Sequence, residues 1–118
     1  MPQNTPLPNF LKLSDIADEL NNHQNSIKRV FVRNENTDSA ITQVAYGFMQ
    51  KGESSGLHQH ATMDEYFYFT KGAGTFIIGE GEHKISPATF FRVLATTPHN
   101  LTQTGNGVLE FFYFGVAV

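Results

Sequence analysis

The sequence predicts an all-β domain, a sandwich or barrel of antiparallel strands with one short helix near its N-terminus. Aromatic residues, 11 Phe and 4 Tyr in 118 residues, gather in short runs at 66–69, 90–91 and 111–114, and such runs are typical of strands. Turns rich in glycine separate roughly nine or ten short segments of this kind at regular spacing, which is the pattern of all-β folds.

The N-terminal part has a different pattern. Residues 1–9 are rich in Pro and Asn and predict an irregular arm. Ser14 can cap a helix formed by the following D-I-A-D-E-L, because acidic residues fill the first turn and the apolar residues share one face. The polar segment 21–25 would end this helix. We therefore assign residues 1–26 to an arm and a short helix, and residues 27–118 to the β-domain.

From Ile27 onward the apolar period changes from 3.6 to 2, which indicates strands. Turn-forming residues separate the apolar segments, and no repeat or linker interrupts them, so we expect a single domain. The expected strands are 27–33, 40–50, 57–60, 65–70, 75–79, 83–86, 90–93, 100–103 and 108–118.

Composition excludes several classes of protein. The chain has no cysteine, which excludes disulfides, thiolate metal sites, iron–sulfur clusters and cysteine nucleophiles and agrees with a cytoplasmic location. A net charge of −3 without a basic stripe argues against a nucleic-acid partner. Apolar runs are short and broken, so we expect no membrane span, and the N-terminus does not have the pattern of a signal peptide.

The segment 52–72 holds the most specific pattern in the chain. On a strand, His58 and His60 would project from one face, side by side, and could bind one metal ion. A turn at 61–64 would reverse the chain and place Glu65 across from both histidines. Imidazole and carboxylate ligands suit Fe, Mn, Ni, Cu, Co or Zn. By itself, the H-x-H spacing more often reflects two solvated or hydrogen-bonded histidines.

The complete string is far more specific, and it resembles the first motif of the cupin superfamily, G-(x)5-H-x-H-(x)3–4-E-(x)6-G. Gly52, His58, His60, Glu65 and Gly72 fill every fixed position of this motif. The resemblance covers most of the chain. It implies a cupin jelly roll, in which two antiparallel sheets close a small barrel.

The second cupin motif, G-(x)5-P-x-G-(x)2-H-(x)3-N, is only partly present. His99 stands at the position of its histidine, but the other fixed positions hold Ala88, Leu94, Thr96 and Gln103. The resemblance implies one divalent transition metal ion with one or two open positions, as catalytic sites have. The ligands that it implies are His58, His60, Glu65 and His99.

Several other residues are weaker candidates for a site. If Glu65 points inward, Phe67 and Phe69 share its face and would form a dry wall around the metal, although core packing is their default role. Glu110 would be a proton-transfer group with a raised pKa if it faced the interior. Lone charges on strands usually face water, so we favour an ordinary surface charge for Glu110. Further candidate pocket residues are Gln43, Gln50 and Arg92.

The remaining two histidines do not enter the site hypothesis. His23 lies in a segment rich in Asn and Gln, and His83 follows a hairpin turn. We expect both side chains in solvent.

The resemblance implies a small-molecule substrate and leaves three functions open. A redox-active metal with open positions can bind O2 and a chelating substrate, as in cupin dioxygenases, whereas a Lewis-acid metal can polarise a carbonyl, as in cupin sugar isomerases, lyases and cyclases. A wall of Phe side chains would protect the oxygen chemistry from water, so we prefer the oxidoreductase. The third function is non-catalytic binding of a small molecule, which would not require all four ligands.

The closing strand also predicts an interface. The segment 108–118 has apolar residues at both odd and even positions, whereas a strand with one solvent-facing side should alternate apolar and polar residues. We expect a second subunit or the N-terminal arm to cover its outer side. Cupins commonly form dimers through sheet faces or exchanged N-terminal strands, so the resemblance implies a homodimer.

Overall fold

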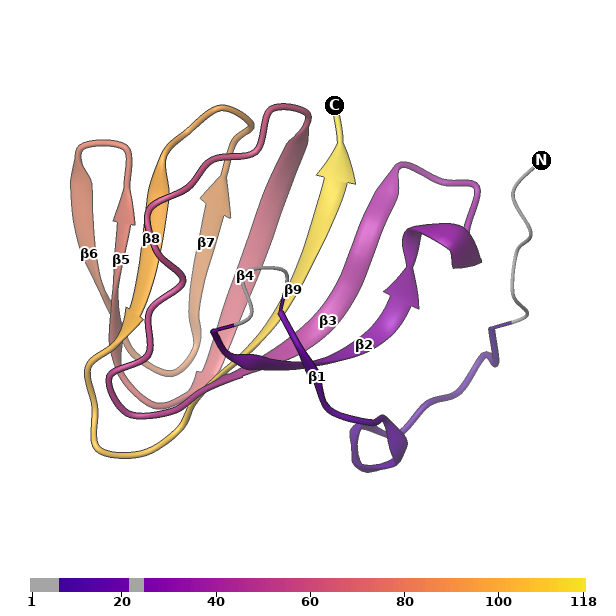
Figure 1. Cartoon of the computed structure of the whole chain (residues 1–118), viewed down its shortest axis with the longest axis horizontal. Coiled ribbons are helices and arrows are strands. Elements are labelled where there is room, and N and C mark those ends of the chain that lie inside the picture. Colours follow the sequence, from indigo (N-terminus) through magenta and orange to yellow (C-terminus); the bar gives the residue numbers. More distant parts are fainter. Residues whose placement is uncertain (1–6, 22–24) are drawn as a thin grey trace.

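The computed structural model of this chain describes residues 7–21 and 25–118. Within these ranges the structure consists of strands and two single 3-10 turns, η1 (Leu13–Asp15) and η2 (Asn34–Asn36) (Figure 1). The strands are β1 (Glu19–Leu20), β2 (Ile27–Arg33), β3 (Ile41–Met49), β4 (Met63–Lys71), β5 (Gly74–Ile78), β6 (Gly81–Ile85), β7 (Thr89–Val93), β8 (His99–Gln103) and β9 (Leu109–Ala117).

Two antiparallel sheets face each other, as expected of a jelly roll. The larger sheet has six strands in the order β1-β2-β3-β9-β4-β7, and the smaller one has three in the order β6-β5-β8. The last strand, β9, lies between β3 and β4 in the middle of the larger sheet (Figure 1). The strands predicted from Ile27 onward are therefore confirmed to within two residues, with the exception of the one expected at 57–60.

The two sheets do not close into a continuous barrel, which is consistent with the predicted jelly roll. The two sheets are separate, and the segment expected as a strand at 57–60 makes only an isolated bridge, from His58 to His99. A second isolated bridge joins Ser54 to Thr102. The chain before β4 thus follows the β8 edge of the smaller sheet without forming a continuous ladder.

The short N-terminal helix is not formed, apart from the single turn η1. Glu19 and Leu20 instead pair with Lys28 and Ile27 of β2. An isolated helix of this length is marginal in water, whereas pairing with β2 satisfies the backbone groups of β1. Two ion pairs accompany the pairing, Arg29 Nε to Asp18 Oδ1 at 2.7 Å and Arg33 Nη2 to Glu19 Oε1 at 2.5 Å.

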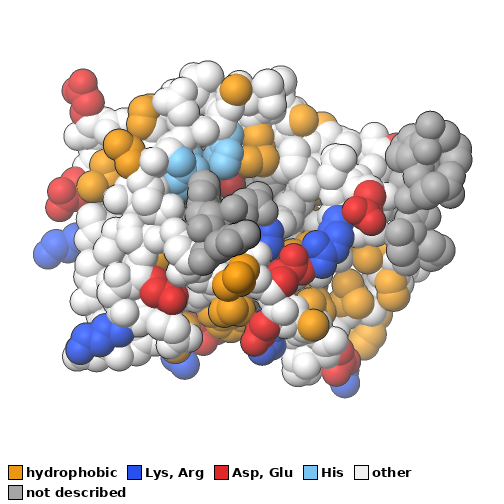
Figure 2. Space-filling view, viewed as in Figure 1, with side chains coloured by type: hydrophobic (Ala, Val, Ile, Leu, Met, Phe, Trp, Pro, Cys, Tyr) orange, Lys and Arg blue, Asp and Glu red, His pale blue; other side chains and the backbone are white. Residues whose placement is uncertain are grey.

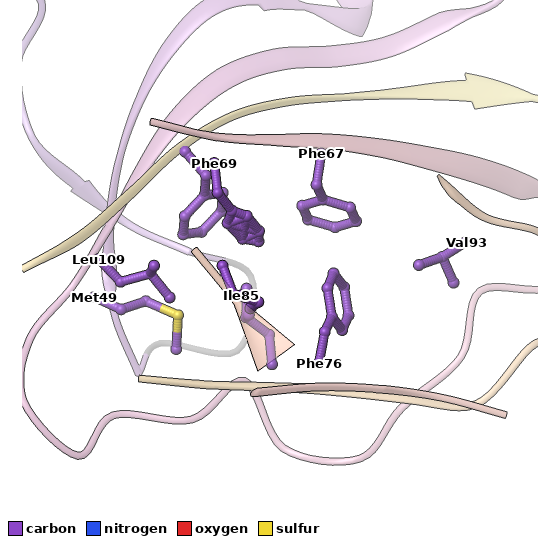
Figure 3. Packing of buried hydrophobic residues seen from close by; sticks show 9 residues of the cluster. Met49, Phe67, Phe69, Phe76, Ile85, Val93 and Leu109 are labelled. Carbon is purple, nitrogen blue, oxygen red and sulfur yellow. The ribbon is translucent and has the colours of Figure 1, made fainter. Parts of the chain in front are cut away.

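The core lies between the sheets and is mostly aromatic. On β4, Phe67 and Phe69 face inward and are buried, whereas Tyr68 is exposed, which confirms the predicted alternation. Figure 3 shows Phe67 and Phe69 projecting toward Phe76 of the facing sheet. The rings of Phe67 and Phe76 meet edge to face with centroids 5.1 Å apart, a favoured geometry for aromatic pairs. The core cluster consists of Met49, Phe67, Phe69, Phe76, Ile85, Val93, Leu101, Leu109 and Phe111.

The two histidines outside the candidate site and the N-terminal arm lie only partly within the described residues. His83 is exposed, as expected, whereas His23 lies outside the described residues. The expected irregular arm is described only from Leu7, and residues 7–9 are exposed without helix or strand. Within residues 7–21 and 25–118, no helix has the length and apolar character needed to cross a membrane.

Replacing Phe69 with Ala should lower the free energy of unfolding by about 3–5 kcal/mol, because it leaves a cavity in a fully buried site. Urea denaturation followed by circular dichroism measures this change. The matched control is Phe10→Ala, since Phe10 is 73% exposed and surface substitutions usually change stability by about 0.5 kcal/mol or less. Equal losses in both variants would contradict this account of the core.

Candidate metal centre

The four residues of the cupin-like motifs come together at one end of the space between the sheets. One potential ligand atom from each of His58, His60, Glu65 and His99 lies within 4.8 Å of every other. Glu65 comes from β4 of the larger sheet and His99 from β8 of the smaller sheet. The two sheets therefore meet at this cluster.

Glu65 reaches the histidines by a route that differs from the prediction. It does not lie on a strand adjacent to the histidine segment, but pairs with Val93 of β7 and Gly115 of β9. His58 pairs instead with His99. The turn after His60 carries the chain from one sheet to the other, so the carboxylate approaches from the opposite layer.

Backbone hydrogen bonds fix the positions of the three histidines. The amide of His58 donates to the carbonyl of His99 at 3.0 Å, and the amide of His99 donates to the carbonyl of His58 at 2.8 Å. The imidazole rings of this pair have centroids 4.2 Å apart. The carbonyl of His60 accepts from the amide of Thr96 at 2.6 Å.

The protonation of two imidazoles follows from their hydrogen bonds. Nδ1 of His58 lies 2.8 Å from the carbonyl oxygen of Gly56, and Nδ1 of His99 lies 2.8 Å from that of Thr97. A carbonyl oxygen can only accept, so each Nδ1 carries a hydrogen, and in the neutral ring each Nε2 then keeps its lone pair. Metal-binding histidines are oriented by such contacts to the other ring nitrogen.

His99 Nε2 is the strongest indication that a ligand belongs here. This atom is buried and has no hydrogen-bond partner among the described residues. It lies 3.3 Å from Oε1 of Glu65, and when the ring is neutral its lone pair and the carboxylate oxygen are both acceptors. Leaving a buried acceptor unsatisfied costs free energy, and a cation between the two atoms would satisfy both.

Glu65 is an anion at neutral pH. Burial is the largest effect on its pKa and acts to raise it, but the hydrogen bonds and charges of His60 and His99 in their protonated forms together outweigh burial and lower the pKa to about 2. Oε1 of Glu65 lies 3.1 Å from Nε2 of His60. This hydrogen bond is the main cause of the raised pKa of His60.

The donor set fits a divalent transition metal ion. Ligand atoms bound at about 2.0–2.2 Å from one ion can be at most about 4.4 Å apart, so the observed spread of up to 4.8 Å requires only a small contraction. Three imidazole nitrogens and one carboxylate oxygen suit several first-row metals and do not choose among them.

The second cupin motif is only partly present in this chain, but its segment keeps the backbone conformation that the missing glycines would provide. Ala88 and Thr96 have φ of 65° and 66°, in the left-handed region that costs non-glycine residues about 1–2 kcal/mol. Thr96 is β-branched, for which this conformation is a true outlier. Its amide holds the carbonyl of His60, so the loop still serves the site without glycine.

The four candidate ligands, His58, His60, Glu65 and His99, all line a pocket with a volume of about 210 Å³. Its apolar wall includes Phe67, Phe76 and Phe111, and Gln43 is one of its polar residues. Figure 2 shows the histidine side chains together on one face of the molecule, with hydrophobic side chains beside them.

The other sequence candidates lie elsewhere. Phe69 is fully buried in the core and Gln50 and Arg92 are exposed, and none of them lines this pocket. Glu110 contacts Tyr46, whose hydroxyl donates to it at 3.1 Å, and Lys71, whose Nζ is 3.7 Å away. These contacts agree with a surface charge.

Sequence reasoning missed two ionisable residues of the pocket, Lys28 and Tyr113. Lys28 is only 4% exposed, and burial lowers its pKa. Burial also raises the pKa of Tyr113, and the charge of Glu65 adds to this effect. Strand alternation could have predicted that both residues face inward. Lys28 lies two residues from buried Val30, and Tyr113 lies two residues from buried Phe111, so each pair is on the same face of its strand.

The family of the cupin domain matches residues 46–115, and the chain belongs to this family. No curated protein sequence matches at a significant level.

Solved structures show the same fold. A predicted oxalate decarboxylase from Thermotoga maritima is 22% identical with a TM-score of 0.85, over 92% of this chain and 99% of that one. The polyketide cyclase RemF from Streptomyces resistomycificus is 10% identical with a TM-score of 0.79, over 94% and 80%. A sugar phosphate isomerase from Silicibacter pomeroyi is 17% identical with a TM-score of 0.76, over 92% and 76%.

Purified without chelator or nickel affinity resin, the protein should carry close to one transition metal ion per chain, measured by elemental analysis. His58→Ala and His99→Ala should each lose most of this metal, because each removes an oriented imidazole ligand. His83→Ala is the matched control, since His83 is exposed and outside the cluster. Metal retained in His99→Ala would contradict a ligand role for His99, the histidine of the second cupin motif.

Proposed function

We propose that this chain is a metal-dependent enzyme of the cupin family that acts on a small organic molecule, and that it is an O2-dependent oxidoreductase of the dioxygenase kind. The observation that carries the proposal is a donor set of three imidazoles and one carboxylate that opens onto a small, partly aromatic pocket. Such a set leaves open positions on a five- or six-coordinate ion. A redox-active ion bound there would supply electron transfer to O2.

The chain's own residues would prepare this site. His58 and His99 present their Nε2 lone pairs, and ionised Glu65 supplies the negative charge that balances a cation. The Phe67, Phe76 and Phe111 side chains exclude water from one side of the pocket. Tyr113, with its raised pKa, keeps its hydroxyl hydrogen and could donate a hydrogen bond to an oxygen atom of the substrate.

A second candidate function is metal-dependent isomerase, lyase or cyclase chemistry. The pocket contains Lys28 and Tyr113, two groups that can hold or move a proton. Two of the structural relatives carry the names polyketide cyclase and sugar phosphate isomerase. The third candidate is a cupin that binds a small molecule without converting it.

The test compares the same protein loaded with Fe(II) and with Zn(II). With Fe(II), the protein should consume O2 in an oxygen-electrode assay in the presence of one or more members of a panel of small chelating catechols, diketones and hydroxy acids. His99→Ala should lose this activity. Conversion of a panel member by the Zn(II) form without O2 would favour the isomerase, lyase or cyclase. Binding without conversion by either form would favour the third function.

We also propose that the protein is a cytoplasmic homodimer. The absence of cysteine supports a reducing compartment. The outer face of the larger sheet carries a cluster of aromatic side chains, in which Phe90 is 59% exposed and Phe112 is 36% exposed. Rings of Tyr66 and Phe114 stack beside them at 5.0 Å. Exposed apolar patches of this kind commonly mark interfaces, and a second copy of the chain would cover this one.

Light scattering coupled to size exclusion at micromolar concentration should give twice the 13.2 kDa mass of one chain. Phe90→Asp should give the mass of one chain with an unchanged circular dichroism spectrum, because a charge cannot be buried in an apolar interface at low cost. Phe10→Asp is the control for an exposed Phe outside the sheets. A monomeric mass for the unmodified protein would disprove the dimer.

A further inference from the structure

A glycine on β3 lies beneath an aromatic ring in the wall of the pocket. Gly47 is buried in the interior of its strand and is paired in register with Phe111 of β9. Both residues line the pocket. A β-carbon on Gly47 would come within 2.5 Å of Cζ and 2.7 Å of Cε2 of the Phe111 ring. The ring thus takes the space of a side chain at position 47, and glycine within a strand often marks such a close approach.

The backbone of Gly47 does not itself require glycine, because its φ lies outside the left-handed region. The reason for glycine is therefore the Phe111 ring, which is packed on its other sides. The centroid of this ring lies 5.0 Å from that of Phe69 and 5.3 Å from that of Tyr113. Phe69 is fully buried in the core, and closely packed cores leave no room for an aromatic ring to move. A larger side chain at position 47 would therefore push the ring into the pocket.

Gly47 and Phe111 lie at a distance from the candidate metal ligands. Gly115 of β9 is paired with Glu65 of β4, and Phe111 is four residues away from Gly115, or about 13 Å along the strand. Glu65, Gly115, Phe111 and Gly47 all line the pocket. The pocket therefore extends along the strands, from the candidate metal centre at one end to Gly47 and Phe111 at the other.

The end of the pocket at Gly47 is apolar. Met49, two residues from Gly47 on the same face of β3, is 1% exposed and also lines the pocket. Lys28 is paired with Gly47 in register, but its Nζ donates to Oε1 of Gln43, which lies four residues from Gly47 along β3. The ammonium group is thus turned toward the metal end. An apolar surface that includes an aromatic ring suits an apolar or aromatic part of a ligand.

We propose that Gly47 is a specificity-determining residue. By leaving room for the Phe111 ring to lie across β3, it keeps open an apolar subsite that receives the aromatic body of the substrate, while the substrate's oxygen atoms face the candidate metal centre. This proposal deepens the proposed function by naming its substrate class, a compact aromatic compound with oxygen substituents, and it rests on that function for the identity of the ligand as a substrate.

The size of the pocket makes the position of one ring decisive. Its volume of about 210 Å³ is below the roughly 300–1,000 Å³ of pockets for drug-sized ligands. A shift of the Phe111 ring by the width of one methyl group therefore removes a considerable part of the space. Large ligands should lose affinity before small ones do, and this difference distinguishes a specificity role of Gly47 from a purely structural one.

The test measures binding of phenol and 2-naphthol, which differ by one fused ring, in NMR titrations that follow the backbone amides. The variants are Gly47→Ala, Phe111→Leu and the double variant Gly47→Ala/Phe111→Leu. Gly107→Ala is the matched control, because a β-carbon on Gly107 would meet no atom within 4 Å and Gly107 does not line the pocket. Each protein is titrated free of metal and loaded with Zn(II), and its metal content and thermal unfolding are measured.

We expect the metal-free unmodified protein and Gly107→Ala to bind 2-naphthol about fivefold or more tightly than phenol, since a second ring buries more apolar surface. Gly47→Ala should lose most of this preference, because the displaced Phe111 ring takes the space of the second ring. The double variant should recover the preference and the thermal stability of Phe111→Leu, because the shorter Leu side chain removes the clash. Metal content should not change, since neither residue belongs to the metal-ligand cluster.

Three results would overturn the proposal. The first is an unchanged preference for 2-naphthol in Gly47→Ala. The second is an equal loss of affinity for both probes that the double variant does not reverse, which would make Gly47 structural only. The third is that the metal-free unmodified protein binds neither probe, or binds 2-naphthol without a shift of the Gly47 amide signal, which would exclude an aromatic subsite at this end of the pocket.

The double variant decides the matter if Gly47→Ala does not fold, because it carries the same alanine without the clash. A preference for 2-naphthol in the double variant equal to that in Phe111→Leu would support the proposal, and its absence would overturn it. Failure of the protein to take up metal would count against the proposed function alone, since the metal-free titrations test the subsite independently.

Discussion

Two reciprocal backbone hydrogen bonds between His58 and His99 hold the candidate metal centre together. They tie the loop before β4 to the first residue of β8, at the edge of the smaller sheet. Because the chain then crosses to the larger sheet, Glu65 meets the histidines from the opposite layer. The site therefore depends on the distance between the sheets, and that distance is set by the aromatic core below it, where Phe67 and Phe69 pack against Phe76.

The interior has two regions with different physical character. At one end, interlocked apolar side chains such as Phe69 and Leu109 exclude water completely. At the other, three imidazoles, a carboxylate, a lysine and a tyrosine surround a small pocket. Phe67 belongs to both regions, because it packs in the core and also lines the pocket. Buried charges are tolerated only beside compensating groups, and this explains why the polar groups are concentrated in one place.

The second cupin motif illustrates which part of a motif the fold requires. Its glycines are replaced, yet Ala88 and Thr96 adopt the left-handed conformation, and the amide of Thr96 still holds the carbonyl of His60. The surrounding contacts impose the backbone geometry at a local cost in strain. The position of the histidine is thus kept by the fold, and the glycines only make that geometry less costly.

The sequence by itself determined the strand pattern, the alternation that puts Phe67 and Phe69 on the inward face of their strand, and the four residues of the candidate site, because alternation and motif spacing are local properties of the chain. The tertiary structure decided which faces meet. It brought Glu65 across from the opposite sheet, buried Lys28 beside Gln43, and turned the expected N-terminal helix into strand β1. These outcomes depend on pairing between distant segments, whose free energy outweighs the weak local preferences that a short stretch of sequence expresses.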